Sequence, residues 1–143
     1  MKLYNFFPLP RLIPEATGSR IKALEIAQTI ACEIHPVNNL RLLNYLTRQL
    51  AETADAKTAW YKHWVEEGLA AVEALLASAS SGDYCIGDSV TVADCCLIPQ
   101  IANALRMDCN VEKFSRTQQV YHHCMSLPAF ISAAAQNQID FTA

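Results

Sequence analysis

A helix start at Thr91 is the feature that most restricts what this chain can fold into. Thr91 and Asp94 have the spacing of a capping box, in which each side chain accepts a hydrogen bond from the backbone amide of the other residue. Residues 92–105 contain no charged side chain other than Asp94. A helix without a polar face has to be enclosed by other helices. The pattern therefore predicts a central core helix, bent at Pro99, which has no backbone N–H to donate.

Apolar residues at spacings of three and four predict the helices around this core helix. The longest carries Trp60 and Trp64, which we expect to pack inward. Residues 78–88 are rich in Ser, Gly and Asp, which is typical of a loop. The expected helices run from Ser19 to Pro36, where the proline ends or kinks the helix, from Asn38 to about Leu50, from about Ala54 to Ala77, from Thr117 to Met125, and from Leu127 and Pro128 onward.

One strand-like stretch, residues 2–6, opens the chain. Two prolines, Pro8 and Pro10, end it, and neither a series of glycine-punctuated strands nor an internal repeat follows. A single strand has no sheet to join. The predicted fold class is therefore all-α, a bundle of five or six helices with a short N-terminal strand-like remnant.

Composition excludes several classes of function. The chain has 143 residues, of which 52% are hydrophobic, enough for one domain with its own core. Its net charge is −3 and it has no long basic run, so we expect no nucleic acid partner. The sequence has neither the apolar run of roughly 20 residues that a membrane span requires nor a signal peptide. These observations predict a soluble, cytoplasmic protein with free thiols and no membrane partner.

Two groups of potentially reactive residues have structural explanations that do not involve a functional site. His122, His123 and Cys124 are consecutive, and successive helical side chains point about 100° apart, so they cannot converge on one metal ion. Cys95 and Cys96 fall on the apolar core helix, where we expect buried, unreactive thiols. The residues therefore predict no metal site and no catalytic residue.

Several segments together resemble one family. They are ALEIA (23–27), IACEIHPVNNLR (30–41), WYKHW (60–64), GD (87–88), TVADCCLIPQ (91–100), NALR (103–106) and LPAF (127–130). These segments are similar to the helical C-terminal domain of zeta-class glutathione transferases of the maleylacetoacetate and maleylpyruvate isomerase type, and the similarity covers roughly residues 8–140. It implies a glutathione transferase C-terminal-like helical domain over residues 15–143.

The first residues imply that a part of such an enzyme is missing. Intact members of the family begin with a thioredoxin-like domain, and residues 1–14 resemble its first strand joined directly to the interdomain linker. The Ser-Ser-Cys-type motif, which holds and ionises the glutathione thiol in the family, has no counterpart in this sequence. The resemblance therefore implies a truncated member of a family of glutathione-dependent cis–trans isomerases, with little or no activity alone and no tight binding of glutathione.

Five residues are assigned to a site by this resemblance alone. Arg106 and Arg41 match positions that bind the dicarboxylate substrate, His35 and Asn39 match positions beside it, and Asn38 matches the glutathione cleft. Guanidinium groups suit the task because they bind carboxylates through paired, charge-assisted hydrogen bonds. A structural explanation also stays open for each: Arg106 stabilises a helix end, Arg41 is solvated, and the other three cap the broken helix.

Other functions remain open. The helical domain could be a non-catalytic module for protein association or ligand binding, and the chain could also be a deletion product without a selected role. The loss of a docked domain would uncover an apolar face. We expect self-association into a homo-oligomer to cover that face, or else the fold-back of Leu3, Tyr4, Phe6 and Phe7 onto it.

Overall fold

Every regular element of the described chain is helical. The computed structural model describes residues 11–79 and 81–141, and within these ranges β pairing is limited to one bridge between Ser81 and Gly87. The all-α prediction is confirmed, while the predicted strand over residues 2–6 lies outside the described residues. The elements are α2 (Thr17–Gln28), the π-helix η1 (Thr29–Ile34), α3 (His35–Asn38), α4 (Leu40–Arg48), α5 (Ala54–Ser78), α6 (Val92–Arg106), α7 (Ser115–Met125), α8 (Pro128–Ala133) and the 3₁₀-helix η2 (Ala135–Asn137).

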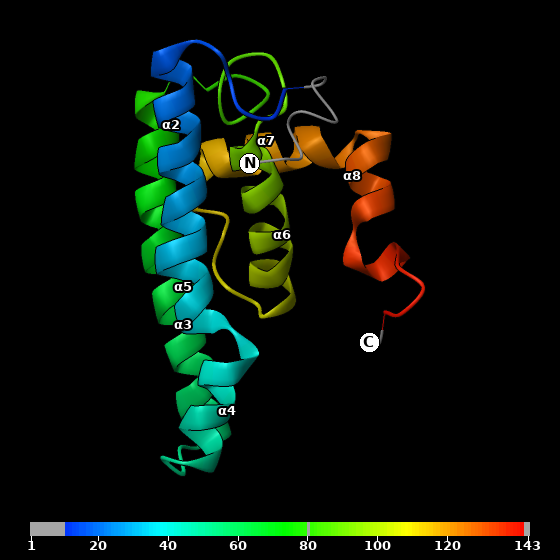
Figure 1. Ribbon diagram of the computed structural model, residues 1–143. Helices are drawn as coiled ribbons and strands as arrows, with labels where there is room; N and C mark the ends of the chain where they lie inside the picture. Colours follow the sequence, from blue (N-terminus) through cyan, green and yellow to red (C-terminus); the bar gives the residue numbers. More distant parts are fainter. Residues whose placement is uncertain (1–10, 80, 142–143) are drawn as a thin grey trace.

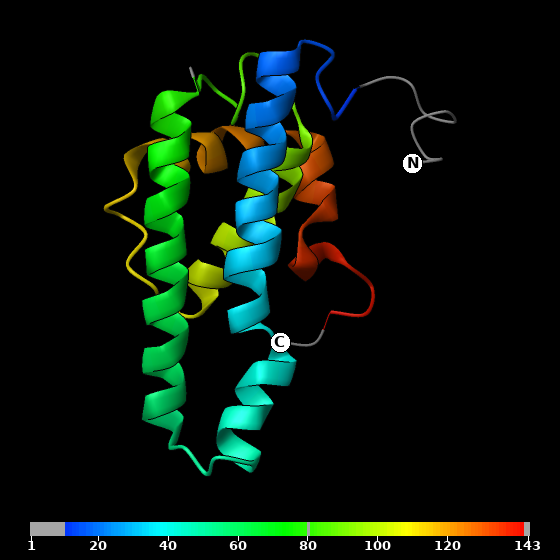
Figure 2. The ribbon, with the colours of Figure 1, turned by 60° about the vertical axis from the view of Figure 1, so that its left-hand side comes forward.

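Two long helical columns organise the fold (Figures 1 and 2). α2, η1 and α3 form one continuous column beside α5, α6 packs against α2 and η1, and α7 packs on both α5 and α6. α4 and the first turns of α5 extend beyond the end of α6, and α8 packs on α7. As a result, the turn between α3 and α4 lies close to the C-terminal end of α6 in both views. Within the described residues, none of the helices combines the length and the apolar composition that a membrane crossing requires.

The two columns approach each other closely at Gly68 of α5. A Cβ atom at this position would lie 2.4 Å from Cγ1 of Ile34, whose side chain is fully buried. Glycine inside a helix is normally unfavourable by about 1 kcal/mol relative to alanine. Here the missing side chain lets η1 and α5 meet, and the core continues around this contact through Ile26, Val65, Leu69, Leu97 and Ile101.

Of the two outcomes that we expected at Pro36, an end or a kink of the helix, the helix does not end there. It passes through η1 and continues as α3 to Asn38, with Pro36 in the first turn of α3, where a missing backbone N–H is tolerated. A π-helical stretch shifts the hydrogen-bond register of a helix. The chain breaks three residues later than Pro36, at Asn39, whose backbone is extended.

The capping box that opens α6 is confirmed. The amide of Thr91 donates to the carboxylate of Asp94 over 2.7 Å, and both residues are buried. The same carboxylate accepts from the amide of Cys85 over 2.8 Å, which the sequence did not predict. Asp94 therefore fixes the start of α6 and also ties the preceding loop to it.

Other features of α6 differ from the prediction. The helix continues through Pro99 to Arg106, but it is not enclosed on every side, because Cys95, Pro99 and Ala102 are exposed and Leu105 is 46% exposed. The prediction that Cys95 is buried is wrong for the same reason. We call the exposed residues Cys95, Pro99, Ala102 and Leu105 the open face of α6. An apolar composition identified the helix correctly, but it could not show which side lacks a neighbour.

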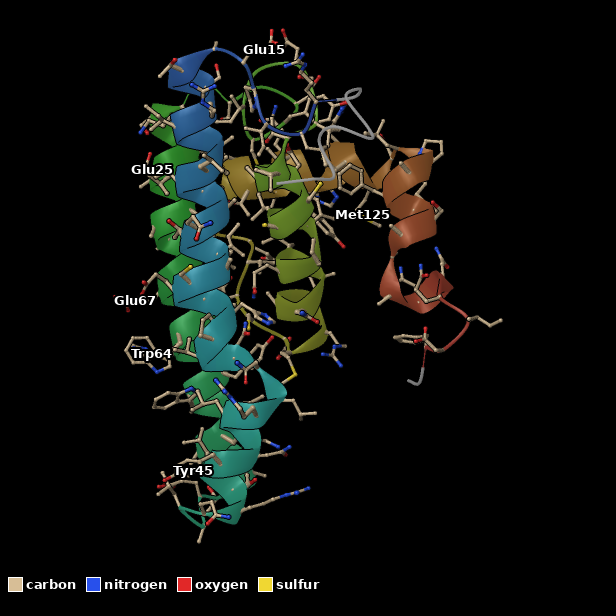
Figure 3. The ribbon with its side chains drawn as sticks, in the orientation of Figure 1. Glu15, Glu25, Tyr45, Trp64, Glu67 and Met125 are labelled. Carbon is tan, nitrogen blue, oxygen red and sulfur yellow. The ribbon has the colours of Figure 1, made fainter. Side chains whose placement is uncertain are left out.

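The two tryptophans of α5 also differ from each other. Trp60 is half-buried, as expected, and its indole N–H donates to the carbonyl of Val37 over 2.9 Å. Trp64 is 38% exposed, and Figure 3 shows it pointing away from α6 together with Glu67. The prediction that both pack inward therefore holds only for Trp60.

Candidate functional site

The turn between α3 and α4 carries four of the five predicted site residues. His35 and Arg41 are exposed, Asn39 is half-buried, and Asn38 is 8% exposed. The hydrogen bond from Trp60 to the backbone of α3 attaches this turn to α5. The exposed side chains of His35 and Arg41 therefore project from a turn whose backbone is attached to α5.

Asn39 has the structural role that the sequence analysis left open, which is to cap a helix at the break in the chain. Its side-chain oxygen accepts from the amide of Leu42 over 3.1 Å and caps α4, while its amide group donates to the carbonyl of Pro36 over 3.0 Å. These two bonds hold the chain across the break between α3 and α4. They leave one amide hydrogen of Asn39 available, and a role in ligand binding stays a prediction.

Asn38 presents an unusual buried donor. Among the described residues, its Nδ2 group has no hydrogen-bond partner, although the residue is almost fully buried. The Nε2 group of Gln100, which is 4% exposed on α6, is in the same state. Buried amide donors without an acceptor are unfavourable by about 1–3 kcal/mol. Such groups are suited to a ligand oxygen or a water molecule.

Arg106 occupies the C-terminal end of α6, where its guanidinium is exposed. One Nη group donates to the side-chain oxygen of Asn103 over 3.3 Å. The buried hydroxyl of Tyr61 lies close enough to sense the charge: burial and Cys109 raise the pKa of Tyr61, and Arg106 lowers it. Asn103 could have been predicted, because it stands one helical turn before Arg106, whereas Tyr61 belongs to α5 and carries no such signal.

The two arginines of the candidate site form no ion pair among the described residues, whereas several other basic residues do. Arg11, Lys22, Lys62 and Lys113 pair with carboxylates. Within residues 11–79 and 81–141, neither Arg41 nor Arg106 takes part in an ion pair. A position at the end of α6 is also favourable for Arg106 because of the helix dipole, so the structural explanation stays open. Chemically, two unpaired guanidinium groups are suited to an acid with two carboxylates.

Several of the cysteines are poor nucleophiles. Burial raises the pKa of Cys109 to about 11 and that of Cys124 to about 12, and it also raises the pKa of the half-buried Cys96. These thiols are therefore protonated at neutral pH. In the described chain, no three His, Cys, Asp or Glu side chains are placed to share a metal ion.

Comparison with known proteins gives a consistent answer. A family model for the C-terminal domain of glutathione S-transferases matches residues 40–133. A probable maleylacetoacetate isomerase from Vibrio cholerae serotype O1 is 41% identical over 134 residues, which are 94% of this chain and 62% of that protein. The solved holo structure of a maleylpyruvate isomerase, a bacterial zeta-class glutathione S-transferase, has a TM-score of 0.94 at 35% identity, over 98% of this chain and 66% of that one.

A more distant solved structure contains ligands. A maleylacetoacetate isomerase from Anaeromyxobacter dehalogenans, 27% identical with a TM-score of 0.90, holds dicarboxyethyl glutathione and citrate in its active site. The match covers 98% of this chain and 62% of that one. The chain spans a little under two thirds of the length of the curated relatives that it matches. It therefore belongs to the glutathione S-transferase family, as the C-terminal helical domain of a zeta-class protein of the maleylacetoacetate isomerase type.

Proposed function

We propose that this chain carries the acid-binding half of a glutathione-dependent maleyl isomerase site. Arg41 and Arg106 bind the two carboxylates of a small dicarboxylate such as a maleyl or fumaryl acid. The observation that supports this proposal best is that both guanidinium groups are exposed and outside the ion pairs of the described chain. They belong to elements whose ends approach each other, the start of α4 and the end of α6.

The remaining site residues orient the ligands. His35 is exposed next to the turn and can donate to a carboxylate, and Asn39 has one amide hydrogen left for the same purpose. The buried, unpartnered Nδ2 of Asn38 fits a polar, peptide-like molecule such as glutathione, because a carbonyl or carboxylate oxygen would satisfy it. These roles follow the resemblance, and His35 and Asn39 are exposed and half-buried, which is compatible with contact to a ligand.

Glutathione, when bound, supplies the thiol that adds to the maleyl double bond in this family. The Ser-Ser-Cys-type motif that ionises this thiol has no counterpart in the sequence. We therefore propose that the 143-residue chain binds glutathione weakly and has little or no isomerase activity alone. We also propose that the helical domain comprises residues 15–143; of the predicted strand remnant and linker over residues 1–14, residues 1–10 lie outside the described residues.

The open face of α6 suggests a partner. Its exposed Leu105 and the neighbouring Pro99 and Ala102 form apolar surface, which proteins usually cover. We propose that a second copy of the chain covers it, giving a homo-oligomer in the cytoplasm. Light scattering over a range of concentrations tests this, and a strict monomer at high concentration would contradict it.

Calorimetric titration with maleate and with fumarate tests the acid-binding proposal. With two solvent-exposed arginines we expect a dissociation constant on the order of 1 mM. Arg41→Ala and Arg106→Ala should each weaken binding by about tenfold. Arg48→Ala is the matched control, because Arg48 is an exposed arginine of α4 outside the candidate site. Equal affinity in all four proteins would refute the proposal.

An isomerase assay tests the proposed lack of activity separately. The purified chain is mixed with glutathione and a maleyl substrate such as maleylpyruvate, and the fumaryl product is followed. We expect a rate no higher than that of glutathione alone. Robust turnover would show that the chain activates the thiol without the motif.

A further inference from the structure

One stripe of α5 is devoted to holding a distant part of the chain. Lys62, Glu66 and Glu73 lie within about 40° of one another around the helix axis. All three contact residues between 108 and 117, the segment that leads out of α6 and into α7. This segment begins two residues after Arg106. The stripe therefore determines how the end of α6 and the start of α7 are attached to α5.

Glu73 acts as the helix cap that α7 lacks. The residue before α7, Phe114, provides no side-chain cap, and the first turn of α7 contains no acidic residue. Instead, the carboxylate of Glu73 accepts from the amides of Arg116 and Thr117, each over 2.9 Å, and from the hydroxyl of Thr117 over 2.8 Å. A negative charge at this position is favourable because of the helix dipole. Burial raises the pKa of Glu73, but the hydrogen bonds from α7 lower it by more, so that the pKa lies below its ordinary value.

Glu66 holds the middle of the segment. Its carboxylate accepts from Lys113 over 2.7 Å and from the amide of Asn110 over 2.9 Å. Both bonds lower the pKa of Glu66, the one from Lys113 most. One turn earlier on α5, Lys62 donates to Asp108 over 2.9 Å. The two glutamates are thus the main polar attachment of a segment whose apolar residues, Cys109, Val111 and Phe114, are buried.

We propose that Glu66 and Glu73 form a carboxylate latch that keeps residues 107–114 and the first turn of α7 closed on α5. When the charge of both carboxylates is removed, this segment opens locally while the helical columns stay folded. The free energy of such a local opening depends on the contacts that attach the segment to the rest of the protein. The buried thiol of Cys109 lies within the segment and reports its opening. This inference does not depend on the proposed function.

Glutamine substitutions test the latch in the full chain at neutral pH. Glu66→Gln and Glu73→Gln keep the side-chain length and one acceptor oxygen but remove the charge. The matched control is Glu67→Gln, because Glu67 is exposed on the same helix and points away from α6. The measurement is the rate at which dithiodipyridine modifies Cys109, located by peptide mass spectrometry. Cys85 and Cys124, which are fully buried outside the segment, report global unfolding.

We expect Cys109 to react about tenfold faster in the double variant, with the control and the two reference thiols unchanged. If Cys109 reacts at the same rate in all proteins, or if all three buried thiols accelerate together, the latch does not exist. Should the double variant fail to fold, Lys113→Met provides the second test, since it removes one partner of Glu66 at an exposed position. A selective increase at Cys109 is expected there too, and its absence would overturn the proposal.

Discussion

Replacing Gly68 by alanine should destabilise the protein, against the usual trend for a glycine inside a helix. Alanine normally stabilises such a position by up to about 1 kcal/mol. Here the new Cβ would lie 2.4 Å from Cγ1 and 2.8 Å from Cδ1 of Ile34, distances that require something to move. Ile34 is fully buried, so either its side chain leaves its rotamer or α5 separates from η1. Overpacking of this kind costs about 1–3 kcal/mol.

The difference of these two effects predicts a net loss of about 1 kcal/mol, or roughly 3–5 °C in melting temperature. Urea unfolding followed by circular dichroism measures it. Gly18→Ala is the matched control, because a Cβ there meets nothing within 4 Å, and we expect it to be neutral or stabilising. In an Ile34→Ala background, Gly68→Ala should become neutral or stabilising as well. If Gly68→Ala stabilises the unmodified protein as much as the control, the close approach of η1 and α5 is wrong.

Two further predictions concern buried and latched carboxylates. Asp94→Ala should lower the free energy of unfolding in urea by about 3–6 kcal/mol, because the buried amides of Cys85 and Thr91 lose their acceptor, and Asp94→Asn should have a smaller effect. The pKa values of Glu66 and Glu73 are lowered from 4.5, so their stabilisation is complete above that pH and is lost as the pH falls through the lower native values. Melting temperatures between pH 7 and 3 should therefore fall more steeply for the unmodified protein than for the variant with both glutamates replaced by glutamine; equal slopes would contradict this.

Local signals in the sequence were sufficient for most of the helices. The capping box at Thr91 and Asp94 could be predicted because its donors and acceptors lie within one helical turn. The continuation of the helix past Pro36 could not be predicted, because no local signal marks the π-helical stretch that precedes it and packs against α5. The cap of α7 was also missed, because Glu73 lies 43 residues before the amide of Arg116 that it accepts from.

The candidate site shows the same division. His35, Asn39, Arg41 and Arg106 are assigned to the site by resemblance, and their partial or full exposure is compatible with that prediction. Arg106 of α6 lowers the pKa of Tyr61 of α5, which is a tertiary electrostatic effect that periodicity does not reveal. Periodicity likewise identified α6 as apolar but left undetermined which side of the helix is exposed.

The most direct test of the proposed site is a titration of the isotope-labelled chain with maleate, followed by NMR. The proposal requires the turn between α3 and α4 and the end of α6 to bind one ligand. It predicts that the backbone amide signals of residues 35, 37–41 and 103–106 shift together with a single affinity, and that Arg106→Ala weakens the response in both segments. Shifts in one segment without the other would contradict the account. It would also be contradicted if no signal shifted at maleate concentrations well above the dissociation constant expected for two exposed arginines, which is on the order of 1 mM.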